Sequence, residues 1–274
     1  MSRAPWLLAV LLVAAFFQAN HPWLTAGLWR DEAGSVYVAS ARTLGDYFFR
    51  YGRVDYAPPL FDGFLRMWGR AAGTSVDSLA WFAALMATAA AAAVAFAAAE
   101  FAGPWAGLFA VLFLLDGDIV FSEFSQVRPY MLSVAAAALA LACTIRLRRR
   151  MDAGVPGRWP SIALGASFVL LAFSHYAGTV AVGSVALAGL VLGVAGGEMR
   201  RRFWRRVVLC ALPSGVLFSF WLPAFLRQRR LGVPWDLGGA GARLRSIGDS
   251  VLLMLPRFGP HEGFLSFLPN DRAR

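Results

Sequence analysis

An acidic pair, Asp31 and Glu32, follows the first apolar segment of the chain. Carboxylates next to a bilayer are costly, so they are retained mainly where they bind a ligand or react. One of the pair could act as a general base. The second carboxylate could raise the pKa of this base by like-charge repulsion. It could instead bind a metal ion or orient the base. A solvated pair in a loop is the alternative interpretation.

A second polar segment precedes a later apolar run and contains Glu123, Gln126 and Arg128, followed by Pro129 and Tyr130. The planar guanidinium fork of an arginine suits a phosphate, because it donates several hydrogen bonds and keeps its charge. Snorkelling to lipid headgroups is the alternative for this arginine. Proline fits the first turn of a helix, so Pro129 is expected to open the next span.

The apolar stretch 160–195 is too long for one membrane span and about right for two, at roughly 20 residues each. The polar residues His175 and Tyr176 lie near its middle and are expected to form the turn between them. Asp55 precedes a double proline that presets the backbone. It is interpreted as a solvated loop residue or as a ligand.

The composition predicts an integral membrane protein. Of the 274 residues, 58% are hydrophobic and 15% are charged, whereas a typical soluble domain has roughly 25% charged residues. The apolar runs lie at 4–19, 79–99, 103–121, 129–145, 160–195 and 207–226. We therefore expect an all-α, polytopic helical bundle of about seven transmembrane helices. The first run is interpreted as a retained span.

The net charge is +10, and every cationic side chain is an arginine. The arginines stand at the ends of apolar runs, so membrane orientation and lipid contact explain them better than nucleic-acid binding. Cys143 and Cys210 fall inside apolar segments, where reduced, packed thiols are expected.

Two arginine clusters, within 146–150 and 200–206, belong on the cytoplasmic side by the positive-inside rule. Residues 20–78 then form a long external loop and residues 121–129 a second one. Asp31, Glu32, Arg128 and His175 all come to the outer face. The arginines of 227–230 would lie on the same face, against the rule.

The long external loop is expected to contain interfacial helices, one of them short, from Ala33 to Leu44. A second, Pro58–Arg70, places its large apolar side chains on one face. Asp62 and Arg66, four residues apart, are expected to pair on the opposite face. The alanine-rich run from Leu79 to Phe101 predicts close helix packing.

Read together, these motifs resemble the membrane glycosyltransferases of the GT-C superfamily, in particular the bacterial dolichyl-phosphate-mannose-protein mannosyltransferase-like group, glycosyltransferase family 39. The matching pieces are Asp31-Glu32-Ala33, Ala57-Pro58-Pro59-Leu60, Ser125-Gln126-Val127-Arg128-Pro129-Tyr130 and the pair His175-Tyr176. The resemblance covers residues 1–226, a GT-C-like transmembrane module. Residues 227–274 are unassigned, and are expected to be interfacial or truncated.

The resemblance implies transfer of a sugar from a polyprenyl-phosphate donor to a hydroxyl of a lipid, glycan or protein, with inversion. It places the reaction at the periplasmic face of a bacterial inner membrane. Asp31 is the implied general base and Glu32 the second catalytic carboxylate. The candidate substrate-binding residues are Arg30, Asp55, Glu123, Gln126, Arg128, Tyr130, His175 and Tyr176.

The metal site is unknown, with a divalent cation as a candidate auxiliary. Two residues depart from the family pattern, Ala57 where histidine is usual and Gln126 where glutamate is usual. They leave metal dependence and activity open. The competing functions are a lipid or solute transporter or flippase, and a non-catalytic, truncated family member.

Overall fold

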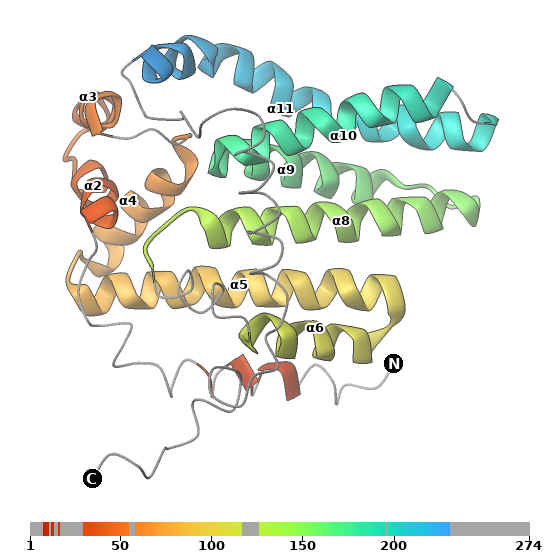
Figure 1. Ribbon diagram of the computed structural model, residues 1–274, viewed down its shortest axis with the longest axis horizontal. Coiled ribbons are helices and arrows are strands. Elements are labelled where there is room, and N and C mark those ends of the chain that lie inside the picture. The colour runs from red at the N-terminus through yellow and green to blue at the C-terminus, as the bar shows by residue number, and fades with distance from the viewer. Residues whose placement is uncertain are drawn as a thin grey trace, which may run out of the picture.

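The computed structural model describes residues 8–10, 12–13, 16, 30–54, 58–116, 126–194 and 197–230, and these are helices joined by short connections (Figure 1). The helices are α2 (Arg30–Ala39), α3 (Leu44–Val54), α4 (Leu60–Ala72), α5 (Val76–Ala102), α6 (Pro104–Asp116), α8 (Tyr130–Asp152), α9 (Arg158–Ser174), α10 (Tyr176–Val194) and α11 (Glu198–Arg230). The described residues contain no strand. The predicted all-α class is confirmed.

Four of the described helices, α5, α8, α10 and α11, are long and apolar enough to cross a membrane. Helices α6 and α9 are also apolar but shorter. Large apolar side chains on α10 and α11 face outward, among them Leu187, Val194 and Phe220, which is 80% exposed. Such surfaces suit lipid rather than water, which supports a membrane protein.

Small residues bring α5, α6 and α8 close together. Ala87, Ala90 and Ala91 of α5 are almost completely buried. A Cβ atom added at Gly107 of α6 would lie 2.6 Å from the carbonyl oxygen of Ala95. A side chain at position 107 would therefore push the two helices apart. The close packing expected from the alanine-rich run is confirmed.

The first apolar run contributes to this part of the core. Of its residues, the structure describes 8–10, 12–13 and 16, all of them helical. Ala9, Val13 and Phe16 are buried against the cluster formed by α5, α6 and α8. A second cluster joins α8, α9, α10 and α11 and includes Cys143 and Cys210, both as free, buried thiols. The expectation for these cysteines is confirmed.

Helices α9 and α10 form the predicted hairpin, and its turn is at His175. His175 ends α9 with an extended backbone (φ −155°, ψ 148°). Its carbonyl oxygen accepts the backbone N–H of Gly178 at 2.8 Å. A Cβ atom at Gly178 would lie 2.0 Å from the Leu171 carbonyl oxygen. This turn therefore needs glycine because the two helices meet directly there.

Helices α2, α3 and α4 gather at one end of the long helices (Figure 1). The predicted helix Ala33–Leu44 begins earlier, at Arg30, and ends at Ala39. The next helix, α3, starts at Leu44. The Thr43 hydroxyl accepts the backbone N–H of Asp46 at 3.0 Å. Such an N-terminal cap fixes where α3 begins.

The predicted helix after the double proline is present as α4, and the two polar residues expected opposite its apolar face are both buried. Asp62 is 1% exposed and Arg66 is 9% exposed. Helix α2 packs against α4, and the Arg66 side chain donates to the carbonyl oxygens of Ala41 and Arg42 at 3.2 and 3.4 Å. These carbonyls follow the end of α2 and need donors, so this polar face is used within the protein.

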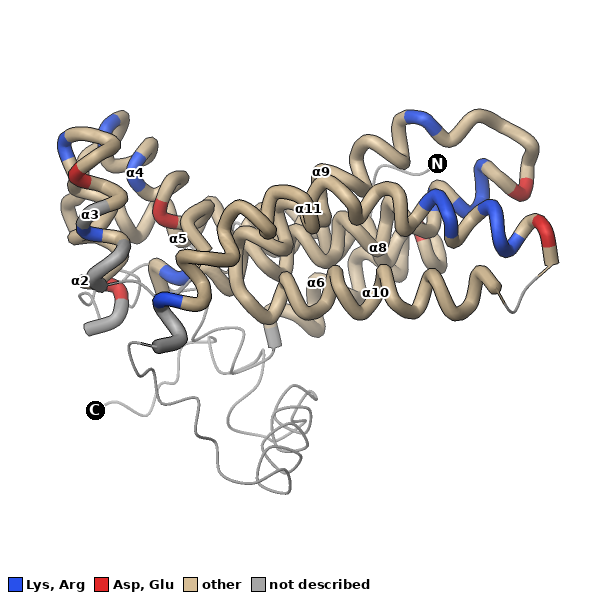
Figure 2. Tube along the Cα trace, turned by 90° about the horizontal axis from the view of Figure 1, so that it is seen from above, with Lys and Arg blue, Asp and Glu red and all other residues tan. Residues whose placement is uncertain are grey.

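The arginine clusters of α8 and α11 lie together at the other end of the bundle (Figure 2). The Arg148 guanidinium lies 5.5 Å from the ring centroid of Phe203. Helix α9 leads from this end to the turn at His175, and α11 returns to the end occupied by α2–α4 (Figure 1). The two clusters therefore share one end, as the positive-inside rule predicts.

Candidate functional site

The candidate site lies at the end of the bundle that carries α2, α3 and α4. Three separate parts of the chain meet there: α2, the segment Gln126–Tyr130 that leads into α8, and the turn between α9 and α10. The predicted residues that these segments bring to this end are Glu32, Gln126, Arg128, Tyr130, His175 and Tyr176.

Glu32 connects α2 to the segment that carries Arg128. Its side chain is 2% exposed, and Oε1 accepts the backbone N–H of Val127 at 2.5 Å. Val127 is itself buried against α4 and α5. A buried carboxylate is tolerated only where hydrogen bonds replace its water. Glu32 therefore fixes the backbone directly before Arg128.

Three side chains follow one another from this segment to the α9–α10 turn. The Arg128 guanidinium lies 6.0 Å from the Tyr130 ring centroid. The Tyr130 ring lies 5.5 Å from the His175 imidazole. The hydroxyls of Ser133 and Ser174 are 2.8 Å apart and join α8 to α9 beside this row. A cation and an imidazole are thus both packed against the ring of Tyr130.

His175 is a partly buried imidazole whose neutral form is favoured. Burial lowers the pKa of the His175 imidazole below its usual range, because the charged form loses water. Its Nδ1 accepts the backbone N–H of Ala177 at 3.1 Å. Because Nδ1 acts as an acceptor, the proton of the neutral ring is on Nε2. His175 can therefore donate one hydrogen bond to an anionic oxygen or a sugar hydroxyl.

Tyr176 extends the site toward α11 and α3. Its hydroxyl oxygen accepts the indole N–H of Trp221 at 3.2 Å. The Trp221 ring lies 5.5 Å from the ring of Tyr51 in an edge-on arrangement. These contacts join α10, α11 and α3 without using charged groups.

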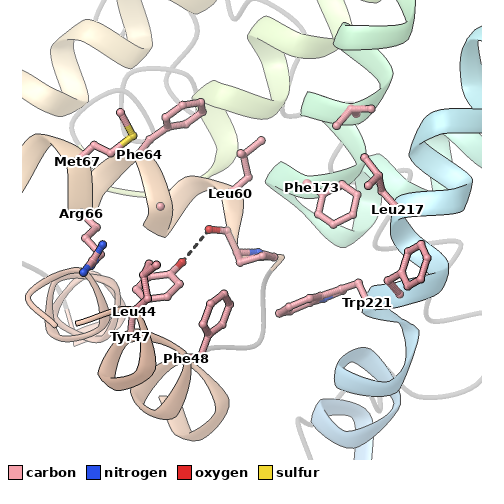
Figure 3. A pocket seen from close by; sticks show the side chains of 14 residues that line it. Leu44, Tyr47, Phe48, Leu60, Phe64, Arg66, Met67, Phe173, Leu217 and Trp221 are labelled. Atoms are coloured by element: carbon pink, nitrogen blue, oxygen red, sulfur yellow. Dashed lines mark hydrogen bonds between the residues drawn. The ribbon is translucent and has the colours of Figure 1, made fainter. Parts of the chain in front are cut away.

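An apolar groove of 600 Å³ opens between helices α3 and α4 on one side and helices α9 and α11 on the other (Figure 3). Its walls include Phe48, Phe64, Phe173 and Trp221. Arg66 is the charged residue among those that line it. Its guanidinium lies 5.7 Å from the Tyr47 ring centroid. The groove suits a long hydrocarbon chain.

Trp221 borders the groove and also contacts Tyr176, the residue after His175. Its side chain lines the groove, while its indole nitrogen donates to the Tyr176 hydroxyl. The Tyr47 hydroxyl, also at the groove, donates to the Pro59 carbonyl oxygen at 2.9 Å (Figure 3). A ligand with an apolar chain and a polar head could thus contact both regions.

Some predicted residues fall outside what the structure describes. Arg30 and Asp31 lie in the first turn of α2, but their side chains are not among the described ones. Asp55 and Glu123 lie outside the described residues altogether. The described side chains contain no cluster of three histidine, cysteine or acidic residues that could hold a metal ion.

The sequence interpretation missed the groove and the part that Arg66 and Trp221 take in it. Arg66 was expected to pair with Asp62 on the face opposite the apolar side chains, and Trp221 was counted as part of a span. The strong amphipathic pattern of α3, with Tyr47, Phe48 and Tyr51, was the available indication. It shows that α3 needs an apolar surface to lie against, but it does not show which helices provide that surface.

Comparison of the chain with protein-family models, with curated protein sequences and with solved structures gives no match.

Replacing Glu32 with alanine is expected to destabilise the protein by about 1–3 kcal/mol, because the buried N–H of Val127 loses an acceptor. Thermal unfolding of the purified protein measures this change. Glu32→Gln keeps a side-chain oxygen at the same place, so we expect it to recover most of the stability. Equal losses in the two variants would show that the charge, and not the hydrogen bond, matters.

Proposed function

We propose that the protein is a polyprenyl-phosphate-sugar-dependent glycosyltransferase of the GT-C kind, related to glycosyltransferase family 39. The observation that carries this proposal is the apolar groove beside the end of the bundle that holds Glu32, Arg128 and His175. A lipid-linked sugar phosphate has the same division into a long apolar chain and an anionic head.

In the proposed reaction, a hydroxyl oxygen of the acceptor attacks the anomeric carbon of the donor sugar. The bond between that carbon and the phosphate oxygen breaks, and polyprenyl phosphate leaves. The hydroxyl proton passes to the Asp31 carboxylate. Direct displacement in a single step inverts the anomeric configuration, as in inverting glycosidases.

The phosphate is already a competent leaving group, so the main demand is positive charge where its negative charge develops. Arg128 would supply this charge, with Arg30 or a divalent cation as an auxiliary. Neutral His175 would donate through Nε2 to the phosphate or to the sugar. Glu32 would hold the backbone before Arg128 in place, so it supports the reaction through position.

The proposal includes the membrane arrangement. Helices α6 and α9 and the first apolar run would complete seven spans with the four long helices. Residues 1–226 would form the transferase module. The arginine-rich end would face the cytoplasm, so the groove and the polar residues would face the periplasm at the inner membrane of a bacterium.

A transporter or flippase would need a polar path through the bundle. The described helices instead pack through apolar clusters along their lengths, formed by residues such as Leu108, Val111, Leu164 and Phe168. The described polar residues of the candidate site, such as Glu32, Arg128 and His175, lie at one end of the bundle. This arrangement favours a transferase, which needs its substrates only at the membrane surface.

Purified protein incubated with radiolabelled polyprenyl-phosphate sugars and a panel of lipid, glycan and peptide acceptors tests the proposal. We expect label to move to an acceptor, with release of polyprenyl phosphate. Reconstitution in liposomes provides the comparison, since a flippase would move the labelled donor between leaflets without transfer. Translocation alone, or neither process, would contradict the transferase assignment.

Filling the groove tests its part in donor binding. Gly63 of α4 lines the groove, and a Cβ atom at this position would meet nothing within 4 Å. Gly63→Trp is therefore expected to occupy the groove without displacing the helix. We expect KM for a long-chain donor to rise by about tenfold, equivalent to about 1.4 kcal/mol of lost binding.

Two comparisons control this prediction. Gly63→Ala adds one methyl group in open space and is expected to leave KM unchanged. A donor analogue with a short, water-soluble isoprenoid chain should be used equally well by wild type and Gly63→Trp. An unchanged KM for the long-chain donor in Gly63→Trp would show that the chain lies elsewhere.

A further inference from the structure

The end of the bundle opposite the candidate site carries a dense group of arginines (Figure 2). Three described acidic residues accompany them: Glu100, Asp152 and Glu198. The ten arginines are Arg146, Arg148, Arg149, Arg150, Arg158, Arg200, Arg201, Arg202, Arg205 and Arg206. This end is therefore strongly positive.

Each of the three carboxylates forms an ion pair with at least one arginine of this end. Glu100 lies 2.8 Å from Arg146 and 3.8 Å from Arg149. Asp152 pairs with Arg148 at 2.9 Å, and Glu198 pairs with Arg202. Within the described part of the chain, five of the arginines have no ion-pair or hydrogen-bond acceptor: Arg158, Arg200, Arg201, Arg205 and Arg206.

Four of these five arginines lie in the early part of α11, and two of them, Arg200 and Arg201, are in its first turn, where positive charge is unfavourable. The amino-terminal end of a helix carries a partial positive charge, so cations there cost stability. Arg201 and Arg205 are also four residues apart on one helix face, a spacing at which like charges repel. An anion bound here would relieve both effects.

The start of α9 adjoins this part of α11. The Arg206 side chain reaches the turn before α9, since a Cβ atom at Gly157 would lie 3.3 Å from its Nη1. Arg158 and Trp159 come next in the chain, and Trp159 is 75% exposed. Ile162, one turn further along α9, is also exposed. The guanidinium of Arg206 is thus brought to the start of α9, where Arg158 follows Gly157 in the chain.

We propose that the surface formed by the start of α9 and the first turns of α11 binds an anionic phospholipid, best one with two phosphates such as cardiolipin. Several guanidinium groups can hydrogen-bond the phosphate oxygens at once. Trp159, exposed at the start of α9, suits the headgroup level of a membrane. This site is independent of the proposed transfer reaction.

A general preference for positive charge on the cytoplasmic side does not by itself predict such a site. Orientation depends on the number of arginines near the span ends, and arginines paired with carboxylates count equally. A lipid site depends on the unpaired ones. The two kinds of arginine at this end therefore allow a matched test.

Native mass spectrometry of the detergent-purified protein, with added cardiolipin or phosphatidylcholine, measures the binding. We expect wild type to retain cardiolipin in preference to phosphatidylcholine. The variant Arg205→Gln/Arg206→Gln should bind cardiolipin about tenfold or more weakly, because each basic residue near the surface contributes to anionic lipid binding. Orientation in the cell does not affect this measurement.

The control variant Arg146→Gln/Arg149→Gln removes two positive charges from the same end, but these arginines already engage Glu100. Its cardiolipin binding should fall by less than about twofold. Equal weakening in both variants would reduce the effect to overall charge and overturn the proposal. Equal retention of cardiolipin and phosphatidylcholine by wild type would also overturn it.

Two further measurements use the wild-type protein alone, so they do not depend on how the variants fold. Added salt should weaken cardiolipin binding, because it screens exposed charges. Binding that does not respond to salt would overturn the proposal. Inorganic pyrophosphate should compete poorly, since it lacks acyl chains. Competition by pyrophosphate at the concentration of the lipid would show a site for a free phosphate compound instead.

Discussion

Asp31→Asn is expected to lower the rate of sugar transfer by roughly 10²–10⁴-fold, the usual contribution of a positioned general base. Asparagine has nearly the same shape as aspartate, but it cannot accept the proton that the acceptor hydroxyl must lose. Asp31 lies in the first turn of α2, next to the buried Glu32. The fall should appear in kcat, measured with radiolabelled donor at saturating concentration.

Asp77→Asn serves as the matched control. Asp77 is an exposed carboxylate in the first turn of α5, so its loss should leave transfer close to wild type. Membrane insertion and the thermal unfolding temperature of Asp31→Asn should also match wild type. Turnover near the wild-type rate in Asp31→Asn would remove this residue from the reaction.

Arg128→Gln is expected to lower transfer by about 10²–10³-fold, as when a single donor to a developing negative charge is removed. The guanidinium is held beside Tyr130 and behind a backbone fixed by Glu32. Glutamine can still donate a hydrogen bond, but it has no charge to stabilise the departing phosphate. Steady-state kinetics with the same labelled donor measures the effect.

Two variants define what Arg128 contributes. Arg128→Lys keeps the charge and loses the planar fork, so its rate should lie between those of wild type and Arg128→Gln. Arg42→Gln removes an exposed arginine from the same end of the bundle and should have little effect. A similar loss in Arg42→Gln and Arg128→Gln would mean that only the local positive charge is needed.

The sequence predicted the helical class and the membrane character because both follow from local composition. Apolar runs must bury their backbone polar groups in helices. The turn at His175 was also predictable, because polar residues interrupt an apolar stretch that is too long for one span. The shared end of the two arginine clusters followed from counting the spans between them.

Tertiary packing decided the details of the site. Glu32 and Val127 are 95 residues apart, and no local pattern relates a carboxylate on one helix to a backbone N–H in a distant loop. The groove likewise depends on how α3 and α4 lie against α9 and α11. Amphipathicity shows that a helix has an apolar face, but not what covers it.

The polar face of α4 is the clearest example of a feature that the sequence alone could not predict. Its sequence predicted that Asp62 and Arg66 face away from the apolar side, and both are buried. Arg66 is buried because the carbonyl oxygens of Ala41 and Arg42 lie within its reach. The sequence by itself determined an α-helical membrane protein with its polar residues gathered between spans. Only the tertiary structure decided which of them are buried, because burial depends on acceptors that another segment supplies.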